Sequence, residues 1–307
     1  MTTWTSWHLH LASAERPLGD RVVTDVVGPA MAEVPSGSWF FMRYWQGGPH
    51  IRLRVRDLPA GAAAALTRTL EQRLAAANRL LPGEEPLDPD RFTAQSRRLA
   101  TAGEGGVPVE DLDLLPPGVY ENQYVPEYER YGGASLIAVS EALFGTSSEL
   151  CLAFLRTRPS DRARTALALR ATAVAASVLD APRFTAFGAT SWNDWAGRAG
   201  YPAAALSALE AECVLAADRL TAEGHDLLAR AAAPGPLRSW HAALSEAVLH
   251  QLGPEQVYTA RILFSHVHML HNRLGLSTLD ELRSYLLLAR QAGPELPTPL
   301  PTAARTA

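Results

Sequence analysis

A change of hydrophobic period near Gly133 divides this sequence into two halves of different predicted structure. Before Gly133, short segments alternate apolar and polar side chains, which is typical of strands with one buried face. After it, apolar residues recur at the spacing of helices that bury one side. We therefore predict an α+β protein. Its N-terminal half, residues 1–132, is mainly β-sheet with crossing helices, and its C-terminal half, residues 133–292, is α-helical.

The length of 307 residues suits one sizeable unit better than two large ones. We expect a single unit over residues 1–292. Residues 293–307 hold four prolines and few apolar side chains, so we expect a disordered tail there.

The elements predicted for the N-terminal half are strands at 4–11, 38–45, 50–56 and 119–124, helices at 20–34 and 60–81, and irregular or inserted structure at 82–118. A Gly-Gly-Pro turn at 47–49 joins two of these strands as a hairpin. Pro29 is expected to kink or end its helix, because proline cannot donate a backbone hydrogen bond.

Seven helices are predicted for the C-terminal half, at residues 134–156, 159–179, 202–218, 219–233, 237–252, 256–272 and 278–291. The segment Trp192-Asn-Asp-Trp195 lies outside them, and we interpret it as packing or as a peptide-contact surface.

Several classes of protein are disfavoured by composition. The formal net charge of -4 argues against a broad basic surface for nucleic acid. The two cysteines, Cys151 and Cys213, make neither a disulfide framework nor a CxxC pair. The N-terminus lacks a signal-peptide pattern, and no apolar run reaches the roughly 18–20 residues of a membrane span. We therefore expect a cytoplasmic protein.

The strand His50-Ile-Arg-Leu-Arg-Val-Arg56 carries the first candidate site. Alternation places its three arginines on one sheet face, about 6.5–7 Å apart along the strand. Guanidinium groups this close repel one another, so a carboxylate or phosphate is a natural partner. The alternative is an ordinary solvated face of an amphipathic strand.

A second candidate is Tyr124-Val-Pro-Glu-Tyr-Glu-Arg-Tyr-Gly-Gly133, which precedes a predicted helix. Its two glycines allow close backbone approach, and a helix N-terminus favours an anion. Glu127, Glu129 and Arg130 could form a polar network with the tyrosines. The alternative is an ordinary junction between a loop and a helix.

The third candidate, Ser265-His-Val-His-Met-Leu-His-Asn-Arg-Leu-Gly275, holds three histidines. His266 and His268 point about 200° apart on a helix, so they do not readily share a metal ion. The HExxH arrangement, a P-loop, a G-x-S-x-G elbow and a G-x-G-x-x-G loop after a strand are also absent. We expect neither a metal nor a cofactor. The alternative for His268 is a satisfied histidine of the core or of the helix end.

Taken in order, these segments resemble the C-terminal elimination domain of class I lantibiotic dehydratases, over roughly residues 4–290. The motifs that carry the resemblance are Trp39-Phe-Phe-Met-Arg-Tyr44, Gly48-Pro-His-Ile-Arg-Leu-Arg54, Pro126-Glu-Tyr-Glu-Arg-Tyr-Gly-Gly133, Ala142-Leu-Phe144 and His268-Met-Leu-His-Asn-Arg-Leu-Gly275. After Phe144 the family commonly has an Asp-Ser pair, where this chain has Gly-Thr-Ser-Ser148.

The resemblance implies an enzyme that removes glutamate from glutamylated Ser or Thr of a ribosomally made precursor peptide, leaving dehydroalanine or dehydrobutyrine. A separate partner protein would attach the glutamate from glutamyl-tRNA. The family roles fall on Arg52, Arg54, Arg130 and His268, with Glu127 and Tyr131 as further catalytic candidates. Within the same motifs, the candidates for substrate binding are Arg43, His50, Asn272 and Arg273.

Two other functions stay open. Thiopeptide pyridine synthases resemble the same domain and join two dehydroalanines in a formal [4+2] cyclisation with release of the leader peptide. A module that only binds the leader peptide, through an exposed strand edge, is the third reading. The expected partners are the precursor peptide and the glutamylating protein, with no direct nucleic acid or membrane contact, and a homodimer is a further expectation.

Overall fold

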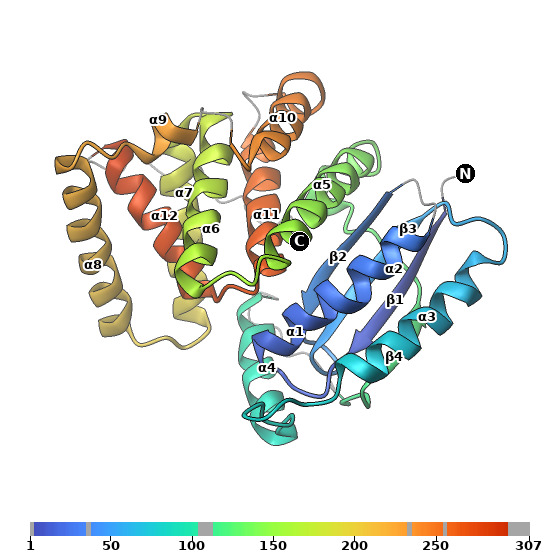
Figure 1. Ribbon diagram of the computed structural model, residues 1–307. Helices are drawn as coiled ribbons and strands as arrows, with labels where there is room; N and C mark the ends of the chain where they lie inside the picture. The colour runs from blue at the N-terminus through green and yellow to red at the C-terminus, as the bar shows by residue number, and fades with distance from the viewer. Residues whose placement is uncertain (1–2, 35–37, 104–112, 232–234, 254–256, 294–307) are drawn as a thin grey trace. The chain divides into compact units, whose positions relative to one another are not determined.

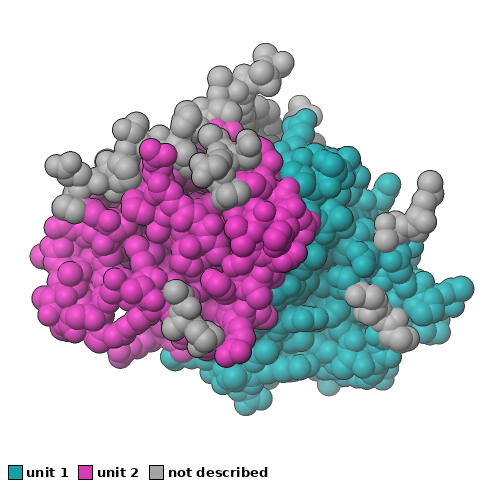
Figure 2. All heavy atoms as spheres, turned by 90° about the horizontal axis from the view of Figure 1, so that it is seen from above, with its two compact units in different colours: residues 1–160, 269–275 teal, residues 161–268, 276–307 magenta. Residues whose placement is uncertain are grey.

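The computed structural model describes residues 3–34, 38–103, 113–231, 235–253 and 257–293. The chain divides into two compact units, which are coloured separately in Figure 2. The first unit comprises residues 1–160 and 269–275, and the second comprises residues 161–268 and 276–307. The expected sequence boundary near 132 therefore falls inside the first unit, and residues 294–307 of the expected tail lie outside the described residues.

The first unit is built on an antiparallel sheet with strand order β2-β3-β1-β4. Its strands are β1 (Trp4–His10), β2 (Ser38–Tyr44), β3 (His50–Arg56) and β4 (Gly118–Asn122). Its helical segments are α1 (Arg16–Val22), the π-helical turn η1 (Val23–Val27), α2 (Gly28–Glu33), α3 (Ala62–Ala77), α4 (Pro89–Gly103), the 3-10 turn η2 (Glu129–Tyr131) and α5 (Ile137–Leu155).

One face of this sheet is apolar and is crossed by α1 to α3 (Figure 1). Trp7, Leu9 and Leu53 on this face are fully buried. Leu70 of α3 is also fully buried, and the indole of Trp7 donates a hydrogen bond of 2.9 Å to Thr67 Oγ1 of α3. Burying each such side chain contributes roughly 1.5–3 kcal/mol, so this face anchors the unit.

The opposite face carries the polar residues of the same strands. The pairing of β1 with β3 places Ser6, His8 and His10 across from Arg54, Arg52 and His50. On the other side of β3, Phe40, Met42 and Tyr44 of β2 lie across from the same three residues. Strand alternation therefore gathers arginines, histidines and aromatic rings on one surface.

The second unit is entirely helical in its described residues. Its helices are α6 (Asp161–Ser177), α7 (Ala181–Arg198), α8 (Ala203–Ala222), α9 (Leu227–Ala231), α10 (Arg238–Ala247), the π-helical turn η3 (Val248–Leu252), most of α11 (Val257–Leu274) and α12 (Thr278–Ala292). Helix α12 packs against α6, α7 and α8, and its Tyr285 and Leu288 are fully buried. A capping box between Ser277 and Asp280 fixes the start of α12.

The predicted α+β class is confirmed, and strand β3 has the predicted bounds. Two helices were missed. Helix α4 lies inside the stretch predicted as irregular, and α7 contains the Trp192–Trp195 segment. The start of α7 did carry a signal, because Asp180 caps its N-terminus and Pro182 follows in the first turn. Around Pro29, the π-helical turn η1 leads into α2 in place of a break.

Helix α5 is long and apolar enough to cross a membrane. Half of its apolar segment is buried inside the structure, however, and the helix packs against β2. The core helix of a globular unit has the same composition, so α5 is accounted for by its packing in the first unit.

Two glycines of α7 offer a test of the second unit. A Cβ at Gly188 would lie 2.2 Å from the ring of Tyr285, whereas a Cβ at Gly197 would meet nothing within 4 Å. We expect Gly188→Ala to lower the free energy of unfolding by about 1–3 kcal/mol through overpacking. Gly197→Ala should leave it unchanged or raise it by up to about 1 kcal/mol, because alanine is the better helix former. Urea denaturation measures both, and equal effects would contradict the close α7–α12 packing.

Candidate functional site

Arg54 of β3 is the centre of the polar sheet face. Its side chain is buried, with 8% of the residue exposed. The guanidinium lies 4.6 Å from the ring centroid of Tyr124 and 5.4 Å from that of Phe40. Its Nη1 lies 3.7 Å from the sulfur of Met42, and its buried Nε has no hydrogen-bond partner in the described ranges of the chain. Among the described residues, no carboxylate forms an ion pair with this guanidinium.

This burial has an electrostatic cost. Burial and the nearby charge of Arg52 lower the pKa of Arg54 to about 10, although Tyr124 and Glu127 oppose the change. The group therefore remains a cation at neutral pH. A buried charge without a counterion is unfavourable, and an anionic ligand would relieve the cost.

Arg52 lies two residues before Arg54 on the same strand face and is half-buried. Its guanidinium stacks 3.4 Å from the ring centroid of Tyr44, and its Nε donates a hydrogen bond of 3.1 Å to His50 Nε2. Burial lowers the pKa of Arg52 as well. The strand therefore presents two adjacent guanidinium groups held by aromatic and imidazole neighbours.

The segment from Tyr124 to Gly133 lies against this surface. Glu127 is close enough to Arg52 and Arg54 to influence the pKa of both. It also pairs with Arg130 at 3.3 Å, in a contact where both side chains are exposed. Tyr131 is buried against Phe144, with ring centroids 5.0 Å apart, and burial raises its pKa to about 12. The structure therefore brings the predicted residues Arg52, Arg54, Glu127, Arg130 and Tyr131 together.

A small pocket opens between this segment and the sheet. Its lining residues are Met42, Arg54, Tyr124, Val125, Glu127, Tyr131, Ile137 and Phe144. Its volume of about 10 Å³ is room for about one water molecule. A larger anion could enter only if side chains of the loop moved, and Val125 there is 69% exposed.

Arg273 is a second buried cation near this cluster. It is fully buried; its Nε donates to Ser148 Oγ at 2.9 Å and its Nη1 donates to the carbonyl of Met269 at 2.9 Å. Burial lowers its pKa to about 10, Tyr131 raises it and Arg54 lowers it further. Its Nη2 has no hydrogen-bond partner among the residues that the structure describes. The predicted binding residue Arg273 therefore lies within electrostatic reach of the arginine cluster.

Ser148 was not predicted as a site residue, yet it joins three elements. Its hydroxyl accepts hydrogen bonds from Arg273 and from the backbone N–H of Phe41, at 2.9 and 3.1 Å. It lies in the Gly145–Ser148 segment, where the sequence departs from the pattern of the family it resembles. The serine connects α5 to β2 and to the last turn of α11.

Arg43 and Asn272 form a brace between β2 and the same turn of α11. The Asn272 side chain accepts from the Arg43 backbone N–H at 2.8 Å and donates to its carbonyl at 3.0 Å. The Arg43 guanidinium pairs with Asp20 at 2.5 Å and donates to the carbonyl of Arg273 at 3.1 Å. In this conformation both residues make structural contacts, so their predicted role in substrate binding would be indirect.

His268 belongs to the second unit. Its Nδ1 lies 3.0 and 3.1 Å from the two carboxylate oxygens of Glu281, and its ring lies 5.2 Å from that of Trp192. The side chain of His268 is 28% exposed, whereas that of Glu281 is 3% exposed. When Nδ1–H donates to Glu281, the carboxylate orients the ring and leaves the lone pair on Nε2. Glu281 was not predicted, although it stands at the capped start of a predicted helix.

A further group of potential ligands lies on the polar face of the first unit. The side chains of His8, His10 and His50 each offer a nitrogen, and these atoms lie within 4.8 Å of one another. Only His50 was predicted as a site residue. Strand alternation places His8 and His10 on one face, but the sequence does not show that β1 pairs with β3.

The comparisons with known proteins agree on the fold. TbtD, a pyridine synthase from thiomuracin biosynthesis, is similar with a TM-score of 0.71 at 17% identity, over 94% of this chain and 97% of its own. TsrL is similar with a TM-score of 0.57 at 15% identity, over 95% of this chain and 94% of its own. No curated protein sequence matches.

The tRNA-dependent lantibiotic dehydratase MibB from Microbispora sp. 107891 is 25% identical over 94% of this chain, with a TM-score of 0.48. The matched part is 28% of the MibB chain. The model of the lantibiotic biosynthesis dehydratase C-terminal family matches residues 4–292, nearly the whole chain. The protein therefore belongs to the family of lantibiotic biosynthesis dehydratase C-terminal domains.

Proposed function

We propose that this protein eliminates glutamate from glutamylated Ser or Thr residues of a ribosomally made precursor peptide. The observation that carries the proposal is the buried guanidinium of Arg54, which forms no ion pair with a carboxylate of the described residues. Arg52, Arg130 and Arg273 add positive charge nearby. Such a site suits a ligand that bears carboxylates, and a glutamyl ester releases one as it reacts.

The elimination needs a base and stabilisation of negative charge. The base removes the Cα proton, the Cβ–O bond of the ester breaks, and the electron pair leaves with glutamate as a carboxylate. His268, oriented by Glu281, is the proposed base because its Nδ1 is held by the carboxylate and its Nε2 can offer a lone pair to a proton. Arg52, Arg54 and Arg130 would hold the departing glutamate and the enolate-like oxygen, with Tyr131 and Glu127 as further proton-transfer candidates.

The remaining predicted residues have supporting roles in this proposal. His50 would orient Arg52 through their hydrogen bond. Arg43 and Asn272 would hold β2 in place, and Arg273 would add charge behind Tyr131. The chemistry asks for no redox cofactor. The proposed partners are the precursor peptide and a glutamyl-tRNA-dependent protein in the cytoplasm, and a homodimer is part of the same proposal.

A pyridine synthase is the second candidate, because TbtD shares this fold over 97% of its own chain. A cyclisation of two dehydroalanines releases no glutamate, so it has no use for a carboxylate grip. The two functions therefore differ in whether the arginines are expected to bind a carboxylate of the substrate. They also differ in the peptide that would accumulate in an inactive variant.

Arg54→Met tests the carboxylate grip. We expect elimination from a glutamylated peptide to slow by about 10²–10³-fold, as for loss of one charge-stabilising donor. The free energy of unfolding should be unchanged or higher, because an apolar side chain replaces a buried charge. Mass spectrometry of the peptide and urea denaturation measure the two effects.

The matched control is Arg56→Met, since Arg56 is two residues further along β3 and pairs with the neighbouring Asp57 at 3.5 Å. It should retain activity. If Arg54→Met eliminated glutamate as fast as the unaltered protein, the proposal that Arg54 binds the glutamyl carboxylate would be wrong.

His268→Ala tests the proton transfer. We expect glutamylated peptide to accumulate and the rate to fall by about 10²–10⁴-fold, and Glu281→Gln to cause a smaller loss with an altered pH profile. The control is His250→Ala, because His250 forms an exposed pair with Glu246 at 3.7 Å.

The peptide that accumulates with His268→Ala distinguishes the candidate functions. Accumulation of linear, dehydrated peptide in place of glutamylated peptide would support the pyridine synthase. A peptide pool that changes in neither way would leave only leader binding and would contradict both enzymatic readings.

A further inference from the structure

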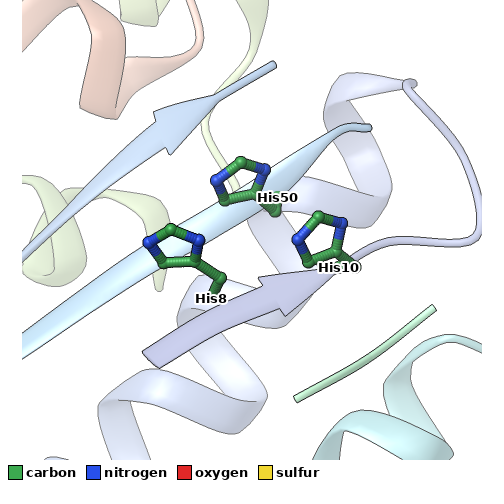
Figure 3. Close-up of side chains that lie close together, drawn as sticks. All are labelled: His8, His10 and His50. Atoms are coloured by element: carbon green, nitrogen blue, oxygen red, sulfur yellow. The ribbon is translucent and has the colours of Figure 1, made fainter. Parts of the chain in front are cut away.

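Three histidines meet at one end of the polar sheet face. His8 and His10 point from the same side of β1, and His50 of β3 lies across from His10 in the strand pairing. Figure 3 shows the three rings gathered over the two strands. The ring of His50 stacks on that of His10 at 4.5 Å and on that of His8 at 4.8 Å between centroids.

His10 is the member of this cluster that most needs a ligand. It is 1% exposed, and within the part of the chain that the structure describes both of its ring nitrogens are buried without a hydrogen-bond partner. Gly48 and the carbonyl of Leu115 lie close by, since a Cβ built on Gly48 would be 3.5 Å from His10 Nδ1 and 3.8 Å from that carbonyl. Burying an unpaired polar nitrogen is costly, so this ring favours a partner that the described residues do not supply.

His50 is already arranged as a ligand. Its Nδ1 lies 2.8 Å from the carbonyl of Gly48, which can only accept, so Nδ1 carries the proton and Nε2 carries the lone pair. A backbone carbonyl behind the imidazole is the usual outer-shell partner of a metal-binding histidine. The Nε2 atom presently accepts a hydrogen bond from Arg52 Nε at 3.1 Å.

All three rings are neutral near pH 7. Burial, followed by the charge of Arg52, lowers the pKa of His8 and His10 to about 4. Burial lowers the pKa of His50 to about 2, although the hydrogen bond to Gly48 opposes it.

We infer that His8, His10 and His50 bind one divalent transition-metal ion of the kind that imidazole prefers, such as Zn²⁺. Three histidines with a fourth position open to water or an anion is a common zinc arrangement. Bound nitrogens about 2.1 Å from the ion lie about 3.4 Å apart. Those of the cluster lie within 4.8 Å, and the rings must turn out of their stacked arrangement for their lone pairs to converge on one ion. Arg52 must also release His50, and its charge opposes the ion.

The test uses the full chain stripped of metal with a chelator. Equilibrium dialysis against Zn²⁺ with elemental analysis should give one ion per chain. Co²⁺ in place of Zn²⁺ should give the visible absorption of a four-coordinate nitrogen site. His8→Ala and His10→Gln should each weaken Zn²⁺ binding beyond the roughly 10–100-fold that loss of an outer-shell partner costs. His250→Ala, an exposed histidine on η3, should bind as the unaltered protein does.

Arg52→Met provides a test of opposite sign. It frees Nε2 of His50 and removes a neighbouring positive charge, so Zn²⁺ should bind more tightly. Circular dichroism checks that each variant folds. If His10→Gln does not fold, the Zn²⁺ affinity of His8→Ala tests the inference, because His8 is only half-buried. Absence of stoichiometric Zn²⁺ in the unaltered protein, or equal affinity in His8→Ala, would overturn the inference. The metal-binding inference does not depend on the proposed elimination. Its tests measure Zn²⁺ binding, whereas those of the elimination measure glutamylated peptide.

Discussion

The buried positive charge of Arg54 is the constraint around which the first unit is arranged. A guanidinium with 8% exposure loses most of its hydration, and the described residues return only ring faces and a sulfur to it. Such a group persists only where packing elsewhere holds it. The opposite sheet face supplies that packing, because Trp7, Leu9 and Leu53 are fully buried under the helices. The apolar face thus offsets the cost of the buried charge on the polar face.

The same alternation explains which features could be predicted from the sequence. The strand from His50 to Arg56 was found with its bounds because period two is a property of the strand alone. The grouping of Arg52 and Arg54 followed directly. Arg130 and Tyr131 were placed with them through resemblance to a family, since nothing local indicates that a distant loop returns to β3. The two missed helices show a different failure. The Pro-, Gly- and acid-rich composition around α4 was interpreted as irregular structure, and the start signal at Asp180 of α7 was not used.

The unpredicted residues are those whose roles depend on long-range partners. Ser148 is an ordinary helical serine until Phe41 and Arg273 reach it from elements more than 100 residues away. Glu281 becomes an orienting group only when α12 packs its N-terminus beside His268. Such contacts cannot be predicted from the pattern of a short segment, because the core as a whole determines strand order and helix packing.

Arg52 lies between the two ligand sites proposed for the polar face. Its guanidinium contacts His50 on one side and neighbours Arg54 on the other, so it cannot serve both without moving. An anion beside Arg54 would draw Arg52 toward it and leave the lone pair of His50 free. A cation among the histidines would push Arg52 in the same direction. If both proposed ligands bind, occupation of either end should favour occupation of the other, since each ligand selects the same position of one side chain.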